Sequence, residues 1–250
     1  VQNVETLCNV PYIVNNGVEW YKAMGSVYKD CPRGTDPVNS GTKLYCISGH
    51  VEKPGVYEVE MGLTVNELIE LAGGVRGGNR LKAVIPGGSS APILTPYECD
   101  VPLDFTSLQM AKTMMGSGGI IVMDETVCMV HALTNLLDFY AHETCGQCTP
   151  CRTGTPWARD ISKRIEHGDG EPGDVDRLIE VANNIANVDT FTWNTICVFG
   201  IAVSWPAVSF ARKFRPEFEA HIREGKCVTL PVDEAVSAPE DNYAWPQVLA

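Results

Sequence analysis

The chain has 250 residues, of which 44% are hydrophobic and 20% are charged, a composition typical of soluble globular proteins. This length suits one large domain or two ordinary ones. No run approaches the roughly 20 apolar residues that a membrane span requires. The net charge of −12, without a cluster of Lys and Arg, argues against a general nucleic-acid role.

The ten cysteines are unevenly distributed: three lie within seven residues and the others are scattered singly. A disulfide framework is typical of small secreted chains and fits this distribution poorly. No basic segment followed by an apolar core of the signal-peptide kind is present. The pattern favours a reduced compartment and a single metal site.

Residues 1–41 form the first predicted part of the chain. A loop is predicted first, followed by a short helix with Val18, Tyr21 and Met24 on one face. The segment 31–41 is rich in Pro, Gly and Asp, which predicts a turn-rich boundary.

Residues 42–124 are expected to form a compact module rich in strands. It contains, in order, a strand at 44–51, a Lys53-Pro54-Gly55 turn, an alternating strand at 56–60, a helix opened by a Thr64–Glu67 capping box and stopped by Gly73-Gly74, and a strand at 83–85. Hairpin, helix and strand in this order are the pattern of a small β-grasp domain.

Residues 125–227 change to a helical pattern. Apolar residues repeat at helical spacing over 129–140, 157–166 and 174–185, and a fourth helix is expected within 197–214. Short connections between them predict a four-helix bundle. The segment 228–250 lacks periodicity and is expected to be extended. The fold class is therefore α+β.

The most specific motif is Cys145-Gly-Gln-Cys148-Thr-Pro-Cys151, in which two C-x-x-C units share a cysteine. A loop curling about a cluster brings every third residue inward, and a [4Fe–4S] cluster needs four such ligands. In a ferredoxin-type run a further Cys-Pro follows three residues on, but Thr155-Pro156 stands there. The fourth ligand must come from elsewhere in the chain.

Cys197 is the favoured fourth ligand, because it stands in an apolar setting at the expected start of the last helix. Cys128 and Cys227 are its rivals. A structural zinc site would also use four thiolates, but usually as two separated C-x-x-C units. Cys148 and Cys151 alone could form a redox dithiol, which is typically placed after a strand in an α/β unit.

Other polar and glycine-rich segments carry weaker signals. Arg152 could stabilise the reduced cluster, or it could be a surface residue paired with Asp160 or Glu143. His131 and His142 could be ligands, although a hydrogen-bonded helical histidine is the better interpretation. The segments 116–119 and 86–90 have the composition of phosphate-binding loops, but they lack the lysine of a P-loop. They are therefore interpreted as plain turns and not as phosphate sites. No G-x-G-x-x-G motif follows a predicted strand, so the sequence does not indicate a dinucleotide-binding fold of its own.

Several motifs occur in an order that resembles one known family. They are residues 1–7 (VQNVETL), 85–90 (IPGGSS), 116–119 (GSGG) and 143–152 (ETCGQCTPCR). Together they resemble the NADH-oxidising flavoprotein subunit of respiratory complex I, which in bacteria is the F subunit of NADH-quinone oxidoreductase. The resemblance runs from Val1 to about Cys227 and concerns the C-terminal part of that protein.

The resemblance implies a β-grasp module of the soluble-ligand-binding type and a helical bundle that holds a [4Fe–4S] cluster. Cys197, within Thr195-Ile196-Cys197, matches the family's fourth ligand. Asn3 matches an asparagine that contacts FMN, whereas Gln2 departs from the family's second asparagine. Residues 1–41 would then be the end of a flavin domain and a linker. Most of the FMN and NADH site would precede Val1, in a missing part or in another chain, so this chain alone should not oxidise NADH.

The implied function is electron transfer from FMN through one [4Fe–4S] cluster within an NADH:quinone oxidoreductase. Implied partners are a thioredoxin-like [2Fe–2S] subunit and a large iron–sulfur subunit, in a peripheral arm at the cytoplasmic face of a bacterial inner membrane or the matrix face of a mitochondrial one. One alternative is the diaphorase subunit of a soluble NAD-linked formate dehydrogenase or hydrogenase. Another is a non-catalytic interaction module with a zinc site.

Overall fold

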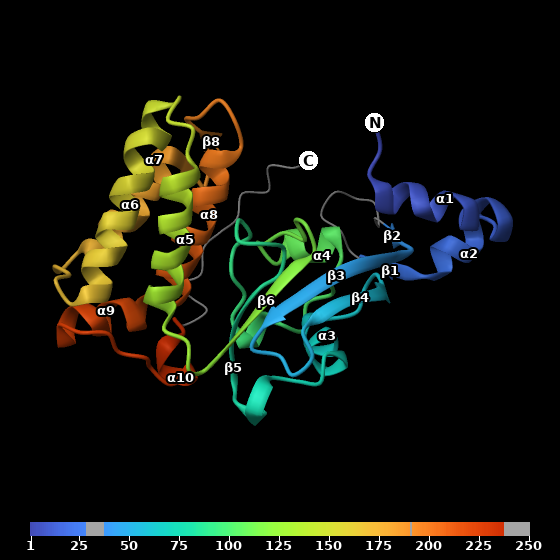
Figure 1. The fold of residues 1–250 in the computed structure, drawn as a ribbon, viewed down its shortest axis with the longest axis horizontal. Coiled ribbons are helices and arrows are strands. Elements are labelled where there is room, and N and C mark those ends of the chain that lie inside the picture. The colour runs from blue at the N-terminus through green and yellow to red at the C-terminus, as the bar shows by residue number, and fades with distance from the viewer. Residues whose placement is uncertain (29–37, 191, 238–250) are drawn as a thin grey trace.

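A computed structural model of the chain describes residues 1–28, 38–190 and 192–237. A twisted sheet with short helices lies beside a layer of longer helices, and two further helices at the chain start extend away from both (Figure 1). Within the described residues, no helix is both long enough and apolar enough to cross a membrane.

The chain begins with α1 (Val4–Asn16) and α2 (Val18–Ala23), followed by β1 (Gly25–Val27), which pairs antiparallel with β2 (Val38–Ser40). The loop predicted before residue 18 is therefore wrong. Asn3 starts α1, because its side-chain oxygen accepts a hydrogen bond from the Thr6 N–H at 3.0 Å. No residue of α1 is buried. The predicted turn-rich boundary lies largely outside the described residues.

A four-stranded mixed sheet with strand order β4-β3-β6-β5 forms the centre of the next module. Its strands are β3 (Thr42–Gly49), β4 (Gly55–Glu60), β5 (Leu81–Ile85) and β6 (Gly119–Asp124). β3 pairs antiparallel with β4 and parallel with β6, and β5 pairs antiparallel with β6. The expected hairpin is thus β3–β4, whereas the central strand β6 was not predicted.

The helix α3 (Val65–Leu71) covers this sheet and begins with the predicted capping box. Thr64 accepts from the Glu67 N–H at 3.2 Å, and Glu67 accepts from the Thr64 N–H at 2.7 Å. The 3₁₀ turns Arg76–Gly78 and Pro96–Glu98 and the helix α4 (Phe105–Met110) complete the module. Its core is apolar and includes Tyr45, whose hydroxyl donates to the Leu103 carbonyl at 2.6 Å.

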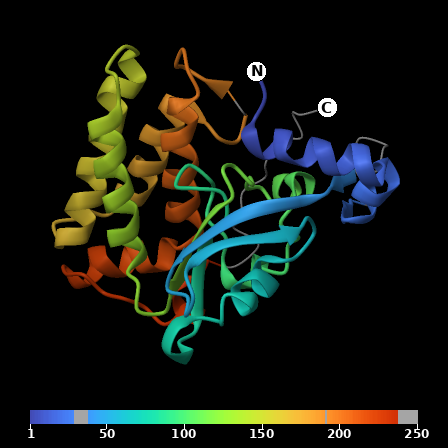
Figure 2. The ribbon, with the colours of Figure 1, turned by 45° about the vertical axis from the view of Figure 1, so that its right-hand side comes forward.

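The helical layer consists of α5 (Met129–Glu143), α6 (Thr149–His167), α7 (Asp174–Ile185) and α8 (Phe199–Lys213). α5 and α7 each pack against both α6 and α8, and Figure 2 shows the four helices side by side. A short hairpin of β7 (Ala186–Asn187) and β8 (Thr192–Trp193) connects α7 to α8. The helices α9 (Arg215–Glu224) and α10 (Val232–Ala235) lie at the opposite end from β8 (Figure 1).

Two sequence-based boundaries in this layer differ from the structure. α6 begins at Thr149 rather than Trp157, because Pro150 in the first turn has its backbone angle already set for a helix. The segment after Cys227 was expected to be extended, but α10 forms within it, and residues 238–250 lie outside the described part.

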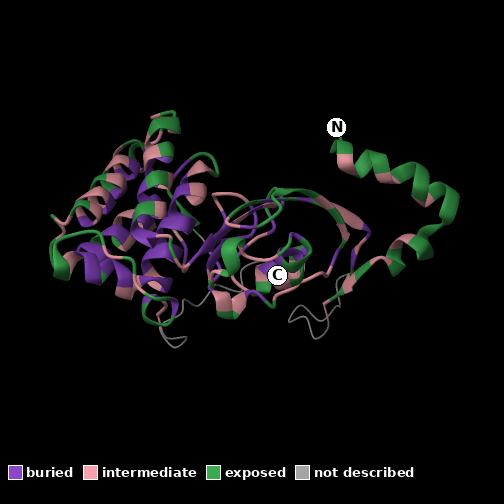
Figure 3. Ribbon diagram, turned by 60° about the horizontal axis from the view of Figure 1, so that its bottom comes forward, coloured by how far each residue is buried: buried purple, intermediate pink, exposed green. Residues whose placement is uncertain are grey.

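The sheet and the helices share buried surface. Along β5, Val84 belongs to the core of the sheet module, whereas Ala83 and Ile85 belong to the core of the helices, as the two-residue alternation of a strand requires. Lys213 of α8 is almost fully buried and contacts the Ile93 carbonyl and the Glu98 carboxylate at 2.8 Å each. Figure 3 shows buried residues in both layers, whereas α1 and α2 are largely exposed.

Candidate metal centre

The three clustered cysteines lie in the connection between α5 and α6. α5 ends at Glu143, and α6 begins at Thr149 with Cys148 as its N-cap residue and Cys151 in its first turn. Cys145 is exposed, Cys148 is half-buried and Cys151 is buried. The three thiols therefore extend from the surface into the end of the helical layer.

A second segment, far away in sequence, reaches this loop. After the β7–β8 hairpin the chain returns toward α6, and the Ile196 N–H donates to Cys148 Sγ at 3.3 Å. Cys197 is the next residue and is exposed. α8 starts two residues later, at Phe199. The structure thus brings the backbone that carries Cys197 against the three-cysteine loop.

The electrostatics of this end of the layer suit anionic ligands. The first turns of α6 and α8 carry backbone N–H groups without intrahelical acceptors, together with the positive end of the helix dipole. Cys151 Sγ also lies 3.2 Å from Thr144 Oγ1 and 3.7 Å from Thr155 Oγ1. These donors can stabilise thiolates, which are the ligands of an iron–sulfur cluster.

The polar residues around the motif have other partners. Arg152 donates to the Gly146 carbonyl at 3.4 Å and so lies over the cysteine loop, not against Asp160 or Glu143. His131 contacts Glu166 at 2.5 Å, and His142 contacts Glu143 at 2.9 Å. Both histidines therefore fit the interpretation of hydrogen-bonded helical residues.

The two glycine-rich segments pack against each other. The Gly88 N–H donates to the Gly119 carbonyl at 2.7 Å, and the Ser117 N–H donates to the Gly87 carbonyl at 3.2 Å. A Cβ added at Gly87 would lie 2.3 Å from the Met114 carbonyl oxygen. The glycines therefore permit close contact between two loops, which supports the turn interpretation over a phosphate cradle.

Cys128 and Cys227, the rival fourth ligands, lie elsewhere. Cys128 is the N-cap residue of α5, at the end of that helix opposite to the Cys145–Cys151 loop, and Cys227 follows α9. Within the described part of the chain, they and His221 form the only group of three potential ligand side chains whose ligand atoms all lie within 4.8 Å of one another.

Asn3 is exposed, and its side-chain oxygen caps α1. It is the one residue of this chain that the resemblance assigns to FMN. One exposed side chain does not by itself build a flavin site.

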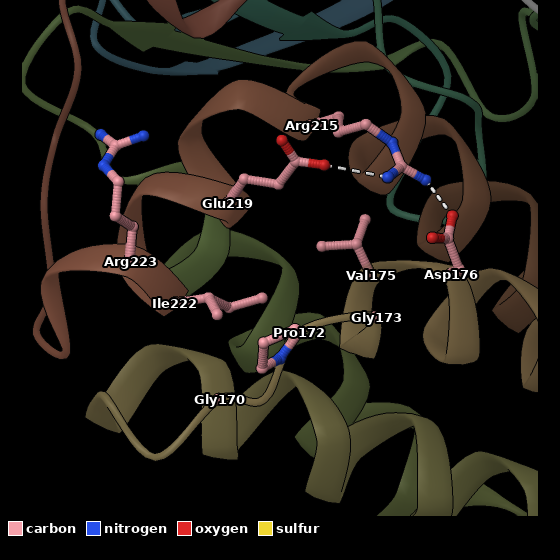
Figure 4. Close-up of a pocket in the computed structure, with 9 residues that line it drawn as sticks. All are labelled: Gly170, Pro172, Gly173, Val175, Asp176, Arg215, Glu219, Ile222 and Arg223. Carbon is pink, nitrogen blue, oxygen red and sulfur yellow. Dashed lines mark hydrogen bonds and ion pairs between the residues drawn. The ribbon is translucent and has the colours of Figure 1, made fainter.

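A cavity of about 460 Å³ lies at the end of the layer that carries α9, between the start of α7 and α9 (Figure 4). Arg215 at its edge forms ion pairs with Asp176 and with Glu219, the latter at 3.0 Å. Arg223 pairs with Glu224 at 3.1 Å. Both arginines at this cavity are therefore paired with carboxylates.

Comparisons with known proteins identify both parts of the chain. Residues 131–221 match the NADH-ubiquinone oxidoreductase-F iron-sulfur binding region, and residues 43–122 match the SLBB domain. The crystal structure of an NAD⁺-reducing [NiFe]-hydrogenase in the H₂-reduced state aligns with 89% of this chain and 34% of that chain, at 31% identity and a TM-score of 0.72.

Curated relatives extend over nearly the whole chain. The NADH-quinone oxidoreductase F subunit of Mycobacterium tuberculosis H37Rv is 40% identical over 238 residues, 95% of this chain and 50% of that protein. The F subunit of Rickettsia conorii is 44% identical over 230 residues, 91% of this chain and 51% of that protein. The chain thus spans about half the length of the relatives it matches. The predicted resemblance is confirmed: nearly the whole chain is similar to one half of the NADH-quinone oxidoreductase F subunits.

Proposed function

We propose that this chain is the electron-transfer part of an NADH-quinone oxidoreductase. In this proposal it accepts electrons that originate from NADH and FMN, both bound mainly outside this chain, and passes them through one [4Fe–4S] cluster to the next subunit. The match of residues 131–221 to an iron-sulfur binding region supports the cluster, because this range includes all four proposed cysteine ligands.

The proposed ligands are Cys145, Cys148, Cys151 and Cys197. The observation that carries this assignment is the Ile196 N–H···Sγ contact to Cys148, which holds the residue before Cys197 against the three-cysteine loop. The bound cluster would supply one-electron transfer. The chain would contribute the thiolates, the donor groups of the first helical turns, and the positive charge of Arg152 near the loop.

The surface beside Cys197 supports a role as a relay. Ile196 is 82% exposed and Val198 is 69% exposed, and Cys197 between them is also exposed. Exposed apolar residues at a redox site suit a surface that another domain or subunit covers. A cluster beneath such a surface would lie close to its electron donor or acceptor.

We also propose a division of the chain into four parts. They are the end of a flavin domain with a linker (1–41), a β-grasp domain of the soluble-ligand-binding type (42–124), a four-helix bundle that holds the cluster (125–227) and a tail (228–250). The strand order β4-β3-β6-β5, with its central pair parallel, supports the β-grasp, and the mutual packing of α5 to α8 supports the bundle.

The proposed partners are a thioredoxin-like [2Fe–2S] subunit and a large iron–sulfur subunit, in a peripheral arm on the cytoplasmic face of a bacterial inner membrane or the matrix face of a mitochondrial one. The hydrogenase structure favours a second candidate, a diaphorase subunit of a soluble NAD-linked enzyme. Copurification decides between them, because a quinone-reducing membrane complex and a soluble hydrogenase or formate dehydrogenase have different partner chains.

The cluster proposal is tested by the iron and sulfide content and the electron paramagnetic resonance of protein purified without oxygen. We expect about four irons per chain and the signal of a reduced [4Fe–4S] cluster. Cys197→Ser should lose most of the iron, whereas Cys46→Ser, at an exposed cysteine of β3, should retain it. Unchanged iron in Cys197→Ser would exclude Cys197 as a ligand. Zinc without iron in the unmodified chain would support the non-catalytic zinc module.

A further inference from the structure

A second group of metal-type side chains lies at the start of α5. The ligand atoms of Cys128, His221 and Cys227 all lie within 4.8 Å of one another. Cys128 is 9% exposed, His221 is fully buried and Cys227 is exposed. The Cys145–Cys151 loop lies at the other end of α5, whose 15 residues rise about 22 Å at 1.5 Å per residue. The two groups are therefore separate sites.

The imidazole of His221 has the orientation of a metal ligand. Its Nδ1 lies 2.8 Å from the Glu217 carbonyl oxygen and must donate to it, while Nε2 accepts from the Val228 N–H at 3.2 Å. These partners assign the proton to Nδ1. The unprotonated Nε2 lies 3.2 Å from Cys128 Sγ. A ring held through one nitrogen by a backbone carbonyl, with the other nitrogen facing thiols, is the usual arrangement of a metal-bound histidine.

A buried ion pair braces the segments that carry these ligands. Lys82 Nζ lies 2.7 Å from Glu217 Oε2, and both side chains are fully buried. Lys82 also donates to the Val127 carbonyl at 2.8 Å and to the Leu230 carbonyl at 3.1 Å. Val127 precedes the first ligand, Glu217 lies one helical turn before the second, and Leu230 follows the third. One ammonium group thus fixes all three segments.

Cys128 itself is positioned by the helix that it starts. Its Sγ accepts from the His131 N–H at 3.4 Å, at the N-terminus of α5. This contact orients the Cys128 side chain at the start of α5, with its sulfur 3.2 Å from His221 Nε2. A disulfide would engage only the two sulfurs, and it would leave the oriented imidazole without a role.

We propose that Cys128 Sγ, His221 Nε2 and Cys227 Sγ bind one Zn²⁺ ion. Two thiolates and one imidazole are ligands that zinc prefers, and the exposure of Cys227 leaves the fourth position to water. Binding releases the two thiol protons, replaces the hydrogen bond from the Val228 N–H to Nε2, and involves no oxidation. The ion fastens the segment after α9 to the start of α5, where the helices meet the sheet.

The test is a competition titration of Zn²⁺ against a chromophoric chelator, with the full chain reduced and its iron–sulfur cluster assembled. Cys227→Ser is the main variant, because an exposed residue can be changed with little risk to folding. Cys128→Ser is the second, and Cys46→Ser is the matched control. We expect the unmodified chain to bind one zinc ion. Both site variants should bind zinc at least about tenfold more weakly than the unmodified chain. Zinc should raise the melting temperature of the unmodified chain and of the control, but not that of the variants.

Two results would overturn the proposal. One is an unchanged zinc affinity in Cys227→Ser, which would mean that any bound zinc lies elsewhere, for example at the Cys145–Cys151 loop. The other is a Cys128–Cys227 disulfide in the isolated chain whose reduction yields no zinc binding. The cluster proposal is independent, because its failure would appear as missing iron, while zinc binding would still depend on Cys227.

Discussion

The buried ion pair between Lys82 and Glu217 allows a quantitative prediction. In Lys82→Met, the apolar stem is kept and the ammonium is lost. Glu217 would then hold an unpaired charge in a fully buried position, and the carbonyls of Val127 and Leu230 would lose a donor. Removal of one partner of a buried pair costs about 3–5 kcal/mol. Because two carbonyls are affected as well, we expect the upper half of that range, about 4–5 kcal/mol.

Most of this cost should come from the charge left on Glu217. Adding Glu217→Gln removes that charge and keeps Oε1, which accepts from the Met129 N–H at 2.8 Å. The double variant should therefore be more stable than Lys82→Met alone, by about 2 kcal/mol. The assay is equilibrium urea denaturation followed by circular dichroism, with the metal-free protein, because the proposed zinc ligands are adjacent.

An exposed ion pair provides the control. Lys22 and Glu19 lie 3.3 Å apart, with side chains 53% and 88% exposed, and Lys22→Met should change the unfolding free energy by less than about 1 kcal/mol. If Lys82→Met cost no more than Lys22→Met, the ion pair would not brace this junction. If the effects of Lys82→Met and Glu217→Gln simply added, the stranded charge could not be the cause.

Two further changes test the packing and the acid sensitivity of the fold. Gly87→Ala should destabilise the chain by about 1–3 kcal/mol, because the new Cβ would lie 2.3 Å from the rigid Met114 carbonyl oxygen; an unchanged melting temperature would show that the loops can separate. Burial alone would raise the pKa of Asp174, but hydrogen bonds from Arg164, Arg177 and the Glu171 N–H, with the charge of Arg164, together lower it below its usual value. This carboxylate therefore contributes stability that is fully present above about pH 4 and is lost as the pH falls through its lowered pKa. The Asp174→Asn variant should be less stable than the unmodified chain at pH 7, and its melting temperature should fall less on acidification. If the melting temperatures of the two proteins fell in parallel with pH, this reasoning would be contradicted.

Features that depend on local chemistry could be predicted from the sequence. The capping box at Thr64 and Glu67 requires only four consecutive residues, and it forms as expected. The β3–β4 hairpin is formed by neighbouring segments joined by a short turn. The spacing of Cys145, Cys148 and Cys151 indicated an iron–sulfur region, which the family comparison supports.

The missed elements depend on distant partners. β6 is an apolar run buried between β3 and β5, without the alternation that marks a half-buried strand. In α6, Gly154 weakens the local helix signal. In the structure Gly154 lies against α7, where an added Cβ would be 2.7 Å from Ile185 Cγ1. A close contact between helices therefore explains a glycine that local propensity disfavours.

Cys197 was favoured as the fourth ligand from the sequence, and the structure adds support to this proposal. α5 separates Cys128 from the Cys145–Cys151 loop by about 22 Å, so Cys128 could reach a cluster there only if the helix unwound. Cys227 lies with Cys128 at that distant end. Of the three, Cys197 alone follows a residue in contact with the loop. Because the two proposed sites use different cysteines at opposite ends of one helix, Cys197→Ser should remove iron and leave zinc, and Cys227→Ser should weaken zinc and leave iron.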